Sequence, residues 1–365
     1  MGADKPQAWR EEKGPQHHRI ELPMRILIGN NVLQKVPEVV GELKASGKVA
    51  LVVGRHTYEA AGRTVEEMLK SSGYEVGVLF VESAHVSEAE AVAQHVAKGD
   101  YDVIVSVGGG KAIDVGKYAA GQTRRPFVSV PTAPSHDGIT SPFASIKGLG
   151  RPVSVRAATP AAIVADVEVI RRAPRRLILA GLGDLLGKLV AVKDWQLAHR
   201  LKGEYYGEYA AQLALLSARH VMRYHEAIAK ATEEGVRVLV EALVSSGVAM
   251  CIAGSSRPAS GSEHLFSHAL DIVAPGRALH GEQVALGTIV MLYIWGDRRW
   301  AMVRRLMERV GLPTKASQIG IEPEKLVEAL TIAHKIRPER YTILGENGIS
   351  REAAWKVLRE TGIID

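Results

Sequence analysis

The first part of the chain alternates short apolar runs with stretches whose apolar positions recur at helical spacing. The runs at 48–54 and 101–110 are almost continuously apolar and end in glycine, which is typical of strands buried on both faces of a parallel sheet. Because helical stretches separate such runs, the pattern predicts a doubly wound α/β sheet. Strands are expected at 26–29, 48–54, 74–81, 101–110, 127–133 and 161–170, and helices at 31–45, 57–71, 87–98 and from Lys111 onward.

The pattern changes near residue 170. Two short pieces before this point, 143–146 and 152–157, predict an antiparallel hairpin attached to the sheet. Beyond it, long helical periodicity takes over and strand signals cease. We therefore predict a flexible tail (1–20), a Rossmann-like α/β domain (21–170) and an all-helical domain (171–365). The expected helices of the latter are 182–200, 204–226, 231–252, 262–273, 281–295, 297–310, 323–334 and 350–361.

Composition narrows the class of protein. The 365 residues are 46% hydrophobic and 24% charged, which is typical of a soluble globular chain. The net charge is +6, but basic residues are scattered among acids without interleaved aromatics, so small anionic molecules are favoured over nucleic acid. We find no apolar run of membrane-spanning length and no secretory signal. A single cysteine, Cys251, fits a reducing cytoplasm, and we expect a cytoplasmic protein without an integral membrane segment.

Two turns at strand ends carry candidate ligand-binding residues. Gly108, Gly109 and Gly110 lie between a buried strand and a helix, where backbone N–H groups can approach a phosphate closely. The spacing matches neither the dinucleotide fingerprint nor a Walker A loop, so a simple tight turn stays possible. The second turn, 130–142, is rich in hydroxyls and contains Asp137. Turns at the carboxyl ends of neighbouring parallel strands are where open α/β sheets bind ligands.

Three histidines gather in the segment 261–281. His264 and His268 are four residues apart and share one face of a helix, and His280 follows a Pro-Gly break. Two imidazoles and one carboxylate would form a metal site with an open position, as a catalytic metal needs. Asp184, in an apolar segment punctuated by glycines, can supply the carboxylate; its alternative role is a helix N-cap.

Several motifs occur in order along nearly the whole chain: GGGKAID, PTAPSHDGITSPFASI, GLGDLLGK, GSEHLFSHALD and LHGEQVALGT. Their combination resembles the family of metal-dependent polyol and alcohol dehydrogenases that includes glycerol dehydrogenase and the dehydroquinate synthases. Within it, SHDGITSPFAS and SSRPASGSEH are most similar to the archaeal sn-glycerol-1-phosphate dehydrogenases.

This resemblance implies an activity and a site. It implies reduction of dihydroxyacetone phosphate to sn-glycerol-1-phosphate for archaeal membrane phospholipids, with NADH or NADPH, in a homo-oligomer. It implies one Zn²⁺ per subunit on Asp184, His264 and His280, with Asp137, Asp184 and His268 as catalytic and substrate-binding residues. The residues that would line the cofactor are Gly108, Gly109, Gly110, Lys111, Ala112, Ile113, Asp114, Thr132, Ala133, Pro134, Ser135 and Ser141.

Two arginines carry separate expectations. Arg55 follows a predicted strand, with no acidic residue before Glu59, so it can accommodate the 2′-phosphate of NADPH; alternatively it points to solvent. Arg257 lies in the serine-rich segment 255–262 just before the helix of His264. It predicts an anion site for the substrate phosphate, whereas the competing interpretation is a simple serine-rich helix cap.

Three other functions stay open on the residues alone. A neutral polyol such as glycerol is the nearest alternative substrate. A lyase of the dehydroquinate synthase type would share fold, cofactor and metal but would need more cationic residues around a carboxylate substrate. A non-catalytic nucleotide- or metal-binding protein would not need Asp137, His268 and the hydroxyl-rich turn together. The residues also leave Zn²⁺ and Fe²⁺ open, because a carboxylate with two imidazoles accepts both.

Overall fold

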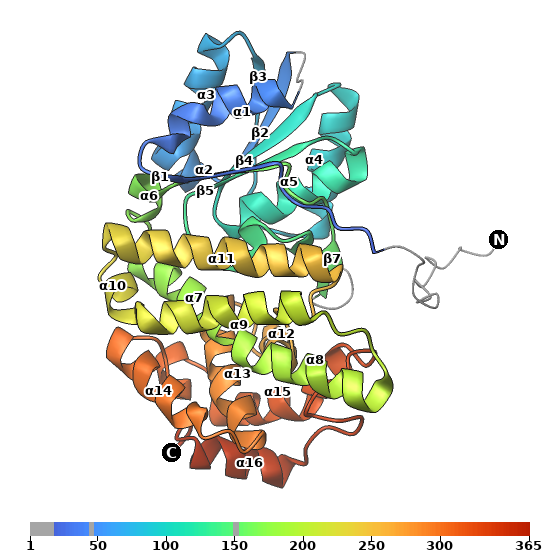
Figure 1. Ribbon diagram of the computed structural model, residues 1–365, viewed down its shortest axis with the longest axis vertical. Coiled ribbons are helices and arrows are strands. Elements are labelled where there is room, and N and C mark those ends of the chain that lie inside the picture. Colours follow the sequence, from blue (N-terminus) through green and yellow to red (C-terminus); the bar gives the residue numbers. More distant parts are fainter. Residues whose placement is uncertain (1–17, 44–46, 149–152) are drawn as a thin grey trace, which may run out of the picture.

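The computed structural model describes residues 18–43, 47–148 and 153–365. In the view of Figure 1 a sheet with its covering helices occupies the upper part of the molecule, and a group of helices occupies the lower part. The predicted tail at 1–20 lies mostly outside the described residues. This arrangement is the predicted one, an α/β layer followed by an all-helical layer.

The sheet has six strands in the order β1-β8-β5-β4-β2-β3, and every pairing in it is parallel. Its inner strands are buried on both faces, as their continuous apolar runs predicted. From β2 the chain crosses to β3 on one side and then returns to β4 on the other, so a topological switch point lies between β2 and β4. The strands are β1 (Arg25–Gly29), β2 (Lys48–Val53), β3 (Glu75–Phe80), β4 (Val103–Gly108), β5 (Phe127–Pro131) and β8 (Ala162–Asp166).

Helices cover the sheet on both faces. Val49, Leu51 and Val53 of β2 pack in one apolar cluster with residues of α1 and α3, whereas Ala50 and Val52 pack in another with residues of α4 and α5. This alternation follows from the two-residue period of a strand. The helical segments here are η1 (Val32–Lys35), α1 (Val36–Glu42), α2 (Arg55–Thr57), the π-helical η2 (Tyr58–Gly62), α3 (Arg63–Ser71), α4 (Val86–Lys98), α5 (Gly110–Thr123), η3 (Asp137–Ile139) and α6 (Val167–Ile170).

The predicted hairpin is confirmed. Strands β6 (Phe143–Ile146) and β7 (Val153–Arg156) pair antiparallel in a separate two-stranded sheet. The segment 161–170 is a strand followed by a short helix, as its predicted exit from the sheet required.

The first long helix of the helical half begins at Arg175, earlier than the predicted residue 182, and the helices are more divided than predicted. The expected helix 182–200 is two helices that meet at Gly187. A Cβ atom at Gly187 would lie 2.7 Å from Cγ1 of Val284, so only glycine lets these helices approach α13 so closely. The helical segments are α7 (Arg175–Leu186), α8 (Lys188–Lys202), α9 (Glu208–Arg223), α10 (His225–Ala229), α11 (Glu233–Ala253), α12 (Ser262–Val273), α13 (His280–Ile294), α14 (Arg299–Val310), η4 (Ala316–Ile319), α15 (Pro323–Ile336) and α16 (Arg351–Glu360).

Helix α11 is apolar enough, by length and composition, to cross a membrane, with a mean hydropathy of 1.8. Here it runs across the middle of the molecule between the sheet and the other helices (Figure 1), and 72% of its most apolar window is buried. Its composition is therefore that of a core helix.

One apolar cluster continues from the sheet into the helical half. It includes Ala50 and Ile104 of the sheet, Ile170 of α6 and Ile178 of α7. The change from strands to helices thus produces no gap in the packing. The predicted domain division at residue 170 stays a prediction.

Candidate active site

The structure brings together the three residues predicted to bind a metal. Asp184 lies near the end of α7, His264 in the first turn of α12, and His280 is the first residue of α13. The Nε2 atoms of His264 and His280 lie 3.4 Å and 3.7 Å from Oδ1 of Asp184. Their candidate ligand atoms all lie within 4.8 Å of one another. Asp184 is inside its helix, so its alternative role as an N-cap is wrong.

The two oxygens of the Asp184 carboxylate have different surroundings. Oδ2 accepts hydrogen bonds from the backbone N–H of Asp137 and from Nζ of Lys188, both at 3.2 Å. Oδ1 is buried without a hydrogen-bond partner and faces the two imidazoles. Burial alone would raise the pKa of Asp184, but Lys188 and the two histidines lower it. An ionised carboxylate oxygen between two imidazole nitrogens fits the donor set that Zn²⁺ and Fe²⁺ take.

Both imidazoles are oriented by buried neighbours. Nδ1 of His264 donates to Oε1 of Glu263 at 2.7 Å, and Ser267 Oγ lies 3.1 Å from Nδ1 of His280. Since Ser267 Oγ donates its proton to Gln283 Oε1, His280 is the donor to Ser267. A neutral ring with its proton on Nδ1 has the lone pair of Nε2 free to bind a metal beside Oδ1 of Asp184. Burial opposes the charge of His264, but the carboxylates of Asp184 and Glu263 raise its pKa, so a metal would displace a proton from this ring. Burial also lowers the pKa of His280, which keeps that ring neutral.

Lys188 is a site residue that the sequence analysis missed. Its side chain is completely buried, and Nζ lies 2.8 Å from Oδ2 of Asp137 and 3.2 Å from Oδ2 of Asp184. Burial opposes its charge, but the two carboxylates raise the pKa of Lys188, so the ammonium is retained. Asp137 also accepts a hydrogen bond from Ser246 at 2.7 Å. The four-residue spacing from Asp184 was the available signal, because it puts both side chains on one helix face.

His268 lies beside the cluster without belonging to it. It is buried in α12, and its ring centroid is 6.0 Å from that of His280 in a stacked arrangement. Burial and then the charges of His264, Arg337 and Arg340 lower the pKa of His268 to about 3. Its Nδ1 atom has no hydrogen-bond partner. This neutral imidazole therefore has one buried nitrogen whose hydrogen-bonding capacity no described protein atom uses, and its predicted catalytic role stays a prediction.

The glycine turn lies at the switch point of the sheet. Gly108 ends β4, Gly109 is the N-cap of α5 and Gly110 begins that helix. A Cβ at Gly108 would lie 2.8 Å from Cβ of Ala112, so glycine permits the close strand–helix packing. The predicted cofactor residues Lys111, Ala112 and Ile113 lie in the first turn of α5, and Asp114 follows them.

The second turn adjoins the first. The N–H of Thr132 donates to the carbonyl of Gly108 at 3.0 Å, which joins the ends of β4 and β5. Ser141 contacts its own loop, since its hydroxyl donates to the carbonyl of Phe143. The other predicted cofactor residues of this turn, Ala133, Pro134 and Ser135, follow Thr132 directly. The contact of all these residues with a cofactor stays a prediction.

Arg55 begins α2 directly after β2, on the other side of the switch point. Its side chain is 76% exposed and forms an ion pair of 3.6 Å with the equally exposed Glu82. An exposed pair of this kind is weak, so it leaves the guanidinium able to exchange Glu82 for a phosphate. The predicted NADPH contact and the solvent-facing alternative both remain open.

Arg257, predicted to bind the substrate phosphate, is engaged elsewhere. Its guanidinium is buried in a two-bonded ion pair with Glu204 and also donates to the carbonyl of Tyr341 at 2.9 Å. Its charge is therefore compensated by the protein itself. The predicted phosphate contact has no support from this geometry, which gives Arg257 a structural role between three loops.

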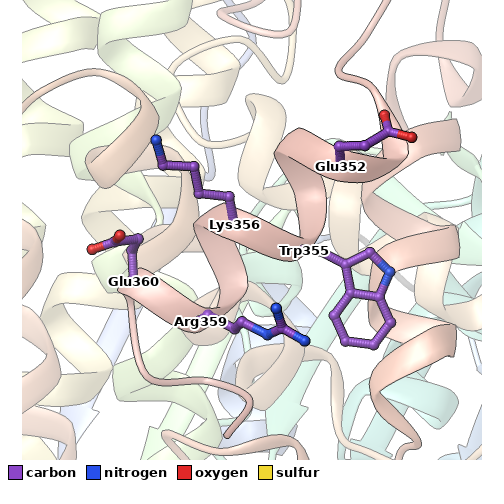
Figure 2. Close-up of a pocket in the computed structure, with 5 residues that line it drawn as sticks. All are labelled: Glu352, Trp355, Lys356, Arg359 and Glu360. Carbon is purple, nitrogen blue, oxygen red and sulfur yellow. The ribbon is translucent and has the colours of Figure 1, made fainter.

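A surface hollow of about 480 Å³ lies apart from these residues. Figure 2 shows its five lining side chains, all from α16. A single solvent-facing helix does not enclose a ligand as binding pockets do. The hollow shares no residue with the metal cluster or with the two turns.

Comparison with known proteins defines the class first. Residues 27–174 match the family model described as iron-containing alcohol dehydrogenase. The solved glycerol dehydrogenase of Schizosaccharomyces pombe superposes with a TM-score of 0.79 at 22% identity, over 95% of this chain and 91% of that chain. A probable glycerol dehydrogenase of Sinorhizobium meliloti gives 0.78 at 24% identity, over 94% and 98%. The fold is that of the metal-type alcohol dehydrogenases.

Sequence relatives define the family within that class. Glycerol-1-phosphate dehydrogenase (NAD(P)+) of Staphylothermus marinus is 60% identical over 95% of this chain and 98% of the relative. The protein of the same name from Hyperthermus butylicus is 53% identical over 95% and 99%. This chain belongs to the glycerol-1-phosphate dehydrogenase family, as its motifs predicted.

Proposed function

We propose that this chain reduces dihydroxyacetone phosphate to sn-glycerol-1-phosphate with NADH or NADPH, and that its metal is Zn²⁺. The observation that carries the proposal is the convergence of Asp184, His264 and His280 beside the turn of Asp137. The likeness of the whole chain to glycerol-1-phosphate dehydrogenases supports the same reaction. The glycine turn at the switch point is the proposed pyrophosphate site.

The proposed metal ligands are Asp184, His264 and His280. Three protein ligands leave a coordination position open, which distinguishes a catalytic site from a closed structural one. When bound, Zn²⁺ supplies Lewis-acid polarisation of a carbonyl, and the reduced nicotinamide supplies a hydride. Glu263 and Ser267 hold the two imidazole rings so that their Nε2 atoms face Asp184.

The remaining residues hold the substrate and supply a proton. Reduction of a ketone to an alcohol takes up one hydride and one proton. Nδ1 of His268 can hold a substrate hydroxyl or relay that proton. Lys188 and Ser246 hold Oδ2 of Asp137, so its other oxygen is directed to a substrate hydroxyl in this proposal.

The cellular setting is inferred from the same likeness. We infer a cytoplasmic homo-oligomer that makes the glycerol phosphate backbone of archaeal membrane phospholipids. The single, buried cysteine supports a reducing compartment. The metal cluster and the glycine turn at the start of α5 support small-molecule chemistry.

The test is the loss of reduced-nicotinamide absorbance with dihydroxyacetone phosphate and, separately, with dihydroxyacetone. Each ketone is assayed with NADH and NADPH, before and after chelation and after Zn²⁺ is restored. We expect activity with the phosphorylated ketone, its loss on chelation and its recovery with Zn²⁺. Faster turnover of dihydroxyacetone would indicate a polyol dehydrogenase, and no ketone-dependent oxidation of either cofactor would reject an oxidoreductase.

A further inference from the structure

Arg340 is a buried cation without an acidic partner. It follows α15 and is 8% exposed. Its guanidinium donates to the carbonyl of Ser260 at 2.5 Å and to the hydroxyl of Ser256 at 2.7 Å. Across the described ranges, no carboxylate oxygen lies within 4.0 Å of it, whereas Arg257 and Arg337 are paired with Glu204 and Glu339.

The surroundings of Arg340 carry an excess of positive charge. The guanidinium groups of Arg337 and Arg257 repel that of Arg340, and the carboxylates of Glu204 and Glu339 oppose this repulsion. Burial, followed by repulsion from Arg337 and Arg257, lowers the pKa of Arg340 well below its usual range. A buried charge is costly unless it is paired, so this position favours an anion.

Arg340 lies near the proposed active site. The segment of Ser256 and Ser260, which it contacts, leads directly into α12, the helix of His264 and His268. The charge of Arg340 acts on the ring of His268, whose buried Nδ1 lacks a partner. Helix α12 and the segment that leads into it therefore connect the metal cluster, an uncommitted imidazole nitrogen and the unpaired guanidinium.

We propose that Arg340 binds the phosphate group of the substrate and determines its specificity for a phosphorylated ketone. The proposal rests on the proposed function. A guanidinium carries five N–H donors, and the contacts to Ser260 and Ser256 account for two of them. Its planar fork matches the oxygens of a phosphate monoester. The Ser256 hydroxyl, which accepts from Arg340, keeps its own proton to donate to the same anion.

The kinetic test compares dihydroxyacetone phosphate with dihydroxyacetone in Arg340→Gln, Arg340→Lys and two control variants. A hydrogen bond to a charged group contributes about 1.5–3 kcal/mol, so KM for the phosphorylated ketone should rise roughly ten- to a hundredfold in Arg340→Gln. In Arg340→Lys, which keeps the charge, KM for the phosphorylated ketone should rise less. KM for dihydroxyacetone should change less than about twofold in both, because that ketone has no phosphate.

The controls separate charge and folding from binding. Arg359→Gln removes one exposed arginine charge on α16, and both ketones should react as in the wild type. Arg257→Gln removes the structural ion pair with Glu204, and both ketones should be affected alike together with thermal stability. If Arg257→Gln affected the phosphorylated ketone selectively and Arg340→Gln did not, Arg257 would be the phosphate-binding residue and the proposal would be overturned.

A binding measurement makes the test independent of turnover. Inorganic phosphate should raise the melting temperature of the Zn²⁺-loaded wild type and inhibit it competitively against dihydroxyacetone phosphate; Arg340→Gln and Arg340→Lys should show weaker effects. If neither variant folds, the measurements with phosphate on the wild type decide. A wild type that phosphate neither stabilises nor inhibits would overturn the proposal. Failure of the wild type to reduce dihydroxyacetone phosphate would reject the proposed function. Equal slowing of both ketones in Arg340→Gln, with phosphate binding unchanged, would reject only the role of Arg340.

Discussion

Glu263→Gln tests how the buried carboxylate beside His264 controls metal affinity. Oε1 of Glu263 accepts Nδ1–H of His264 at 2.7 Å and the backbone N–H of Gly261 at 2.8 Å. Glutamine has nearly the same shape and can accept both hydrogen bonds, but it has no negative charge to make the imidazole a stronger donor to a metal. The substitution thus isolates electrostatics from packing.

The expected loss follows from the position of Glu263 as the support of a single ligand. Changes to such supports weaken metal affinity by about 10–100-fold, which corresponds to roughly 1.4–2.8 kcal/mol. Because Glu263 is fully buried, solvent does not screen its charge and the upper half of this range is expected. Ser267→Ala, which removes a neutral hydrogen bond to His280, should cost less than Glu263→Gln.

The assay is a competition for Zn²⁺ between the protein and a chromophoric chelator, at fixed pH and without substrate. Circular dichroism of the metal-free proteins provides the control for folding. Should Glu263→Gln retain wild-type Zn²⁺ affinity while folded, the carboxylate would not tune the ligand and the proposed role of Glu263 would be rejected.

Three further predictions concern the metal, the cofactor and pH. His264→Ala removes one of three ligands, so bound metal and activity should disappear together; full activity after exhaustive chelation would refute a metal-dependent mechanism. Arg55→Asp should raise KM for NADPH about tenfold or more and change KM for NADH little, and equal effects on both would make Arg55 a solvent-facing residue. Burial and the charge of Glu263 raise the pKa of Asp194 to about 6 from 3.8. Folding therefore takes up a proton at this group between these two values. The contribution of Asp194 to the free energy of unfolding should fall by on the order of 3 kcal/mol as pH rises from about 4 to 6. Urea melts across this range should show a smaller fall in Asp194→Asn, and identical slopes would contradict the shift.

Short stretches of sequence predicted the strands and helices that depend on local patterns of apolar residues. The apolar runs at β2 and β4 predicted buried parallel strands because a strand covered on both faces has no polar side. Helix α12 was predicted with the bounds that the structure gives it, and the spacing of His264 and His268 placed both on one face. Family motifs then indicated Asp184, which periodicity alone could not separate from a capping residue.

Tertiary contacts determined what the sequence analysis missed. Gly187, where α7 and α8 meet, lies against Val284 of α13, which is about a hundred residues away in the chain. Glu263 acts through a buried contact with His264, and the long-range contact of Lys188 with Asp137 is not visible in its four-residue spacing from Asp184. Arg340 lies in an irregular segment beyond α15, and only the packing of that segment against Ser256 and Ser260 reveals its unpaired charge.

The bridge of Lys188 to Asp184 bears on the maturation of the protein. Because the ammonium lies between the carboxylates of Asp184 and Asp137, it partly compensates the charge of Asp184 through Oδ2, which lowers the cost of burying this anion without a metal. Metal binding can then follow synthesis as a separate event, with Oδ1 of Asp184 as a ligand atom. We therefore expect a folded, metal-free form of this chain to which the metal can be added after synthesis.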